Sequence, residues 1–157
     1  MKTLMQQYKL VESARGALFT YLASIPFQKL HIPIEMANNK SVCYLLNHTA
    51  ITYLSWLNEF ALKNPLMMTD ETAWQTINDA KTYYTEVDDC AYNFLAAYDD
   101  KDEMITGYKQ SWNNSLTFSV LQLFTHVITH EFHHKGIILN MTRQLGYTPV
   151  DTDIIRT

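Results

Sequence analysis

The sequence is poor in residues that interrupt helices and in residues that cross-link a fold. It holds only four Gly and four Pro among 157 residues, which is too few for the many turns of a β-rich architecture. Its two cysteines, Cys43 and Cys90, lie far apart and form no CxxC pair. We therefore expect free thiols in a reducing compartment rather than a structural disulfide.

Long basic runs and long apolar runs are also missing. Without clustered Lys and Arg, and with a formal net charge of −4, nucleic acid is not expected as the main partner. No apolar run reaches the length of about 18 residues that predicts a membrane span, and the N-terminus lacks the apolar segment of a secretory signal. These absences predict a cytoplasmic protein that binds neither nucleic acid nor a membrane.

What the sequence does contain is a helical hydrophobic pattern. Hydrophobic residues make up 47% and charged residues 18%, so the chain should fold, and its length suits a single domain over residues 1–157. Apolar positions recur at spacings of three and four, the signature of helices with one buried face. We predict an all-α four-helix bundle, with helices at about 3–24, 40–63, 72–98 and 115–145.

The segments between these helices carry their own signals. Residues 25–40 contain Pro26 and Pro33 and are expected to form the crossing loop. Residues 99–114 are the most polar break and predict an exposed connection. The expected cap positions are Ser41 before the second helix, Asp70 or Thr72 before the third, and Gly146 after the fourth. The remaining tail is expected to pack as an extended arm.

The most informative feature is a cluster of histidines in the fourth predicted helix. Of the six His in the chain, four lie within nine residues: His126, His130, His133 and His134. Residues four apart on a helix lie within about 40° of each other around the axis, so His126, His130 and His134 form one stripe and His133 flanks it. Two imidazoles one turn apart can bind the same ion. Solvated helix faces are usually built from Glu and Lys, so the cluster favours a metal site.

A stable site needs a further ligand, and His48 is the candidate. It lies in the second predicted helix, in the segment LLNHTAITYLSW, beside the apolar stripe. A lone helical His is more often a hydrogen-bonded core or surface residue than a ligand. Spacing by itself therefore leaves both interpretations of His48 open.

His130, Glu131 and His134 also match the short HExxH motif of zincin metalloproteases. In that motif the two His bind zinc and Glu131 would act as the general base. The pattern is short, no metzincin extension follows it, and the chain is small for a protease. A zincin-type protease is therefore a remote alternative.

Two segments carry a family resemblance. LFTHVITHEFHHKGIILNMTRQLGYTPVDTDII resembles the C-terminal half of the DinB/YfiT-like superfamily, and SVCYLLNHTAITYLSWL resembles its second helix. The resemblance implies a four-helix bundle with a long crossover, often a homodimer, and a mononuclear metal site. By position, it implies that His48, His130 and His134 are the metal ligands. His126 and Glu131 are then candidate pocket residues and weak general-base candidates.

The chain departs from the family pattern directly after the ligands. Lys135 stands where the family has Arg, which keeps the charge but loses the planar bidentate fork. Ile137 stands where the family has Gln, so the polar support that a Gln would give to the ligands is in doubt.

The expected ligand set points to chemistry at an open metal position. Three neutral imidazoles leave such a position on zinc or nickel, or on iron as the third choice, and a divalent ion lowers the pKa of a water or thiol bound there. The resemblance implies metal-dependent thiol S-transfer or hydrolysis on a small electrophile, with a low-molecular-weight thiol as one substrate. The alternative is a non-catalytic, metal-bound stress-response or interaction protein.

Overall fold

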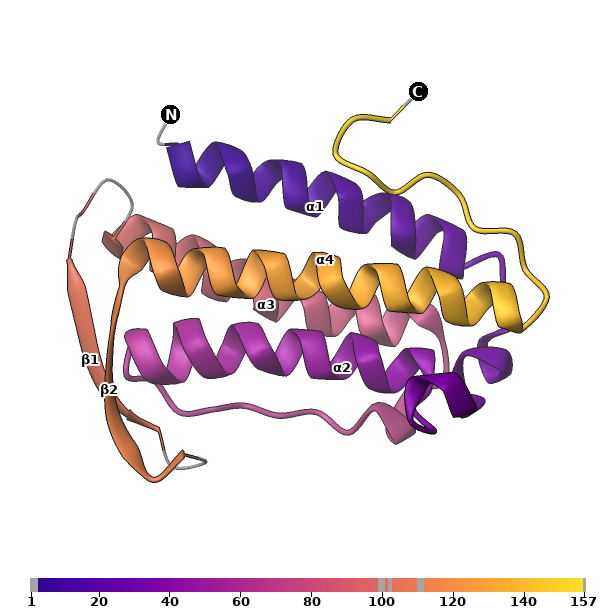
Figure 1. Ribbon diagram of the computed structural model, residues 1–157, viewed down its shortest axis with the longest axis horizontal. Helices are drawn as coiled ribbons and strands as arrows, with labels where there is room; N and C mark the ends of the chain where they lie inside the picture. Colours follow the sequence, from indigo (N-terminus) through magenta and orange to yellow (C-terminus); the bar gives the residue numbers. More distant parts are fainter. Residues whose placement is uncertain (1–2, 99–100, 102, 110–111, 157) are drawn as a thin grey trace.

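Four long helices lie side by side in the computed structural model, which describes residues 3–98, 101, 103–109 and 112–156 (Figure 1). They are α1 (Thr3–Leu22), α2 (Val42–Tyr53), α3 (Ile77–Tyr98) and α4 (Val120–Gln144). A π-helical segment, η3 (Leu54–Ala61), continues α2 directly. The predicted helical bundle is therefore confirmed, but the all-α class is only partly right, because the chain also contains a two-stranded antiparallel sheet.

The crossover connection lies elsewhere than predicted. Residues 25–40 contain two 3-10 turns, η1 (Phe27–His31) and η2 (Glu35–Ala37), and remain at one end of the bundle. The chain crosses instead in residues 62–76, which run back alongside α2 and include the 3-10 turn η4 (Glu71–Ala73) (Figure 1). Helix α1 ends at Leu22, before Pro26, and the tight turns that follow fold this connection back locally. As a result α2 and α3 run in the same direction.

The predicted caps of the second and fourth helices are confirmed, but the predicted cap of the third helix, Asp70 or Thr72, is wrong. Ser41 caps α2 by accepting a hydrogen bond from the Tyr44 amide, and Gly146 follows α4 with a left-handed φ of 93° that suits glycine. Asp70 caps only η4. The third helix begins later, at Ile77, because Asp79 accepts hydrogen bonds from the two amides that precede it.

The connection after α3 is mostly exposed in its described part, as predicted, but most of it forms a strand rather than an irregular loop. Strand β1 (Met104–Lys109) pairs antiparallel with β2 (Asn114–Ser119), with Ile105 opposite Phe118. The predicted helix start near residue 115 is wrong, because residues 114–119 pair in the sheet. Helix α4 begins only after Ser119, which forms a capping box with Gln122.

The hairpin is fixed to η3 by close packing and two lysines. A Cβ atom on Gly107 would lie only 2.9 Å from the Phe60 ring, so glycine lets the strand approach the helix. Lys63 Nζ donates to the Thr106 carbonyl at 2.8 Å. Buried Lys109 donates to Glu59 at 2.9 Å. The hairpin therefore acts as a wall at one end of the bundle (Figure 1).

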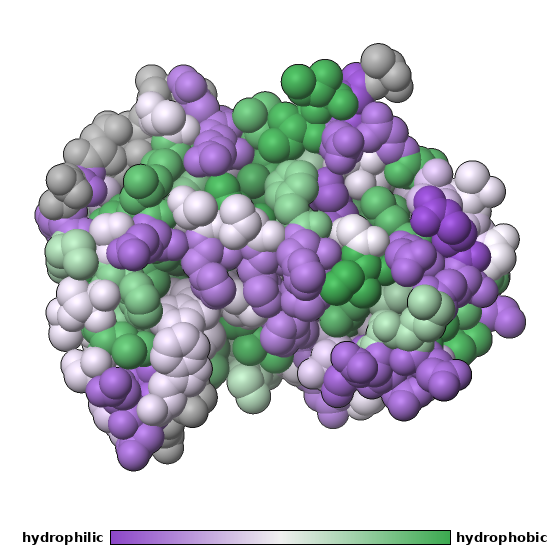
Figure 2. Space-filling view, in the orientation of Figure 1, coloured by the Kyte–Doolittle hydropathy of each residue, from purple (hydrophilic) through white to green (hydrophobic). Residues whose placement is uncertain are grey.

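The C-terminal tail forms the extended arm that was predicted. It turns back over the bundle, where Lys135 Nζ donates to the Thr152 carbonyl at 2.5 Å and Arg156 donates to Ser13 Oγ at 2.6 Å. Figure 2 shows hydrophilic side chains along the face over α4 and a hydrophobic group at the tail, where Ile154 and Ile155 are exposed. Within the described ranges, no helix combines the length and apolar character that a bilayer crossing requires.

Candidate metal centre

Three histidines from two helices converge between α2 and α4. One potential ligand atom each from His48, His130 and His134 lies within 4.8 Å of the other two. His130 Nε2 and His134 Nε2 are 3.2 Å apart. Two nitrogens that bind one zinc ion at about 2.0–2.1 Å are themselves roughly 3 Å apart. The three side chains therefore fit a mononuclear metal ion.

The local sequence explains half of this arrangement and the packing explains the rest. His130 and His134 are one turn apart on α4, and their ring centroids lie 4.4 Å apart. His48 comes from α2, with its ring 5.0 Å from His130 and 4.9 Å from His134. The structure thus brings together the three residues that the family resemblance singled out. That they bind a metal stays a prediction.

The environment keeps these imidazoles neutral at pH 7. Burial, and then the neighbouring imidazoles, lower the pKa of His130 and of His134 to about 4. Burial and the Lys40 ammonium also lower the pKa of His48. A neutral imidazole offers a lone pair to a cation, so the cluster is suited to a metal rather than to an anion.

In two of the imidazole rings, the second nitrogen lacks the hydrogen bond that usually orients a metal-binding histidine. Nδ1 of His130 and Nδ1 of His134 are buried and have no hydrogen-bond partner in the described structure. Metal-binding histidines generally donate this second N–H to an acceptor. Ile137, at the position of the family's Gln, lines the adjacent cleft with an apolar side chain. The lack of hydrogen-bond partners for these two nitrogens agrees with the expectation that Ile137 cannot give the ligands the hydrogen bonds of a Gln.

The other two histidines of the cluster lie on opposite sides of the ligands. His126 packs its ring 5.8 Å from that of His130 and 5.5 Å from that of Trp56, and it lines a separate aromatic pocket. His133 lies with its ring 4.9 Å from His134 and lines the cleft on the other side.

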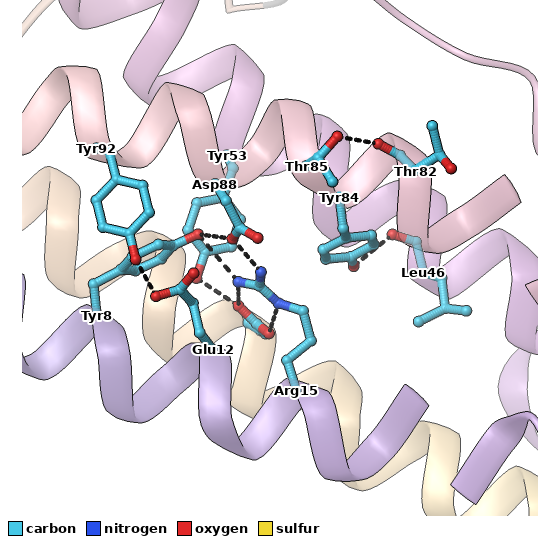
Figure 3. A network of polar contacts seen from close by, with 11 residues as sticks. Tyr8, Glu12, Arg15, Leu46, Tyr53, Thr82, Tyr84, Thr85, Asp88 and Tyr92 are labelled. Atoms are coloured by element: carbon cyan, nitrogen blue, oxygen red, sulfur yellow. Dashed lines mark hydrogen bonds and ion pairs between the residues drawn. The ribbon is translucent and has the colours of Figure 1, made fainter. Parts of the chain in front are cut away.

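Glu131 occupies a different place from the one expected. Its carboxylate accepts hydrogen bonds from Arg15 Nε at 2.7 Å, from Arg15 Nη2 at 3.0 Å and from the Tyr53 hydroxyl at 2.6 Å. Arg15 also pairs with Asp88 at 2.5 Å (Figure 3). Glu131 is thus turned into the core and does not line the histidine cleft. Because both of its oxygens are already bound, it is not free to act as the base of an HExxH protease.

Sequence reasoning missed this buried network, although one signal was present. Arg15 is a charged residue adjoining the apolar stripe of α1, between Val11 and Leu18, and only 5% of its surface is exposed. A buried arginine requires an anionic partner. The helix pattern alone could not say that the partners are Asp88 on α3 and Glu131 on α4.

An open cleft of 610 Å³ adjoins the histidine cluster. Tyr44 stacks parallel to His48, with an interplanar angle of 3°, and Lys40 Nζ lies 4.1 Å above the Tyr44 ring. None of the described residues lining the cleft is acidic, and Lys40 and Asn140 give it polar edges. The cleft therefore suits a small molecule that carries negative charge.

Comparisons with known proteins identify the family of this chain. The profile of the DinB family matches residues 1–157, and the chain therefore belongs to the DinB family. Two relatives from Bacillus subtilis (strain 168) are each 24% identical over 147 residues. Protein DinB aligns over 89% of this chain and 84% of its own length, and the uncharacterized protein YizA over 90% and 87%.

Proposed function

We propose that His48, His130 and His134 bind one divalent metal ion, zinc or nickel before iron. The convergence of their ligand atoms within 4.8 Å carries the proposal. The neutral state of the rings supports it, because a protonated imidazole cannot bind a cation. Imidazole donors suit all three metals, so metal analysis must identify the ion.

We further propose that the site works as a metal-dependent thiol S-transferase or hydrolase for a small electrophile. A divalent ion with three protein ligands supplies Lewis acidity at an open position and lowers the pKa of water or thiol bound there. The open cleft beside His48 and His134 supports access by a small molecule. Its cationic edge at Lys40 would attract the carboxylates that small cellular thiols such as cysteine and glutathione carry.

The residues around the cluster define how the chain would contribute. Tyr44, stacked against His48 and covered by Lys40, would hold the His48 ring in orientation. Glu131 has no role as a base, since Arg15 and Tyr53 occupy its oxygens. A Glu131→Gln variant would therefore affect stability before any chemistry.

Metal content is the first test. Untagged protein, purified without chelators, should contain about one equivalent of metal when measured by inductively coupled plasma mass spectrometry. The His130→Ala variant should contain none. His31→Ala is the matched control, because His31 lies in η1, outside the cluster. Metal-free wild-type protein that also fails to take up zinc or nickel in titration would overturn the site.

Turnover is the second test. Metal-loaded protein would be offered 1-chloro-2,4-dinitrobenzene with cysteine, glutathione or coenzyme A, and the thioether product followed by absorbance. We expect thiol-dependent turnover that His134→Ala abolishes and Lys40→Ala weakens by raising KM. Metal binding without turnover of any thiol or ester substrate would favour the non-catalytic alternative, a metal-bound interaction protein.

A further inference from the structure

A second pocket lies on the other side of the histidine cluster, under the hairpin. It has a volume of 240 Å³ and is lined by residues of η3, the hairpin and the first turns of α4. Its lining is almost entirely aromatic or apolar: Trp56, Trp112, Phe118, Gln122, Leu123 and His126. Pockets for whole drug-sized ligands usually measure about 300–1,000 Å³. This pocket is therefore large enough for only one part of such a ligand.

The aromatic walls are arranged around Trp56. The rings of Trp112, Phe118 and His126 lie 5.6, 5.7 and 5.5 Å from the Trp56 ring, at interplanar angles of 78°, 85° and 81°. These are edge-to-face contacts, the arrangement that aromatic pairs prefer. The lining therefore offers both ring edges and ring faces to a further aromatic ring.

The central ring of the pocket, Trp56, is supported by groups outside the pocket. Lys109 Nζ lies 5.1 Å from the Trp56 ring and is itself paired with Glu59. Trp56 belongs to η3, and π-helical segments of this kind occur frequently at functional sites. A wall that is fixed before binding loses little conformational entropy when a ligand enters.

The pocket is also next to the proposed metal. His126 lines it, and the His126 ring is 5.8 Å from that of His130. A small molecule with a ring in the pocket could thus place a polar end at the three-histidine cluster.

We infer that this pocket binds the aromatic ring of a small substrate whose polar end reaches the metal. The inference deepens the proposed function by naming the substrate class, an aryl compound with a polar or electrophilic substituent. The absence of charged residues from the described lining favours an uncharged ring.

The pocket can be tested on metal-free protein by calorimetric titration with 2-naphthol. We expect binding, with 2-decalol, its saturated analogue, binding several-fold more weakly. Trp112→Ala should lower the affinity for 2-naphthol about tenfold, because a ring contact and apolar area are lost. Gln122→Phe places a larger side chain at the rim of the pocket and should lower the affinity for 2-naphthol by a similar factor. Tyr108→Ala is the matched control, because this exposed hairpin aromatic does not line the pocket.

The proposed connection between the pocket and the metal is tested with a ligand that carries both an aromatic ring and a metal-binding hydroxamate group. On zinc-loaded protein, 2-naphthohydroxamic acid should bind at least tenfold tighter than either 2-naphthol or acetohydroxamic acid. Both Trp112→Ala and His134→Ala should remove this gain.

The outcomes separate the two proposals. If zinc does not bind, the proposed function fails, whereas 2-naphthol binding to metal-free protein still decides the pocket. Equal 2-naphthol affinity in wild type, Trp112→Ala and Gln122→Phe would overturn the pocket. A crystal structure in which a second copy of the chain covers Trp112 and fills the pocket would also overturn it.

Discussion

Arg15 and Glu131 form an ion pair across the interior of the bundle, between α1 and α4. Asp88 from α3 accepts from the Arg15 guanidinium, and the hydroxyl of Tyr53, at the end of α2, donates to Glu131, so that the network joins all four helices (Figure 3). Such a network contributes little net stability if it is complete, but it is costly to break, because one charge is then left buried without a partner.

Arg15→Ala should therefore destabilise the protein strongly. It leaves the Glu131 carboxylate without its cation, and removal of one partner of a buried pair costs about 3–5 kcal/mol. Urea unfolding followed by circular dichroism measures the loss. Lys9→Ala, an exposed residue on the same helix, is the control and should change the free energy of unfolding by less than about 0.5 kcal/mol.

A double variant shows whether Arg15 stabilises the protein through its ion pair with Glu131 or through packing. Arg15→Met combined with Glu131→Leu removes both charges and keeps the volume, so it should recover most of the stability lost by Arg15→Met alone. If the double variant is as unstable as the sum of the two single variants, the ion pair is not the source of the effect.

The two cysteines should be unreactive in the folded protein. Both are buried free thiols, and burial raises the pKa of Cys43 and of Cys90 to about 12. At pH 8 almost no thiolate is present, and the thiolate is the nucleophile. Reaction with 5,5′-dithiobis(2-nitrobenzoic acid) at pH 8 should be at least about 100-fold slower than in 6 M urea. Rapid reaction of the native protein would contradict this.

At the level of elements, the hairpin depends on close contact between β1 and η3. Gly107→Ala should destabilise the protein by about 1–3 kcal/mol, because the added Cβ meets the Phe60 ring at 2.9 Å and forces strand and helix apart. Urea unfolding measures the effect. Ser115→Ala, on the exposed part of β2, is the control. An unchanged midpoint for Gly107→Ala would mean that the hairpin is not tightly packed.

Helix α4, which carries two of the three proposed ligands, depends on the capping box at its start. Ser119→Ala removes the hydroxyl that accepts from the Gln122 amide at 3.1 Å and should cost about 1 kcal/mol. Ser119→Asp keeps an acceptor at this position and should retain most of the stability. Equal losses in both variants would show that the cap bond is unimportant.

For the whole molecule, a bound ion would join α2 to α4, since His48 lies on one helix and His130 and His134 on the other. Zinc at about 100 times its dissociation constant should stabilise the fold by about 2.7 kcal/mol. A calorimetric scan should show a higher Tm with zinc, reversed by a chelator and absent in His48→Ala. In the control His31→Ala the shift should remain. A zinc shift of equal size in His48→Ala would contradict the proposed ligand set.

The homodimer implied by the family resemblance also belongs to this level, and it stays a prediction. The described surface has an exposed apolar group on the C-terminal tail at Ile154 and Ile155, but nothing in the single chain shows which surface would meet a second copy. Light scattering after size-exclusion chromatography gives the mass directly.

The sequence by itself determined that the chain forms four main helices, and it determined half of the candidate metal site. Periodic apolar positions decide which face of a helix is buried, and a four-residue spacing places His130 and His134 side by side on any helix. Ser41 and Gly146 marked helix ends correctly because capping depends on the backbone of neighbouring residues alone. Family resemblance, rather than spacing, selected His48.

Only the tertiary structure decided how these parts meet. The hairpin was missed because its strands are short and half polar, so their pairing and their packing on η3 fix them rather than any strong local pattern. Glu131 was misplaced because spacing gives the direction of a side chain from its helix but not its partner. Arg15 of α1 draws that carboxylate into the core, and the packing of α1 against α4 therefore leaves His130 and His134 to face His48 without it.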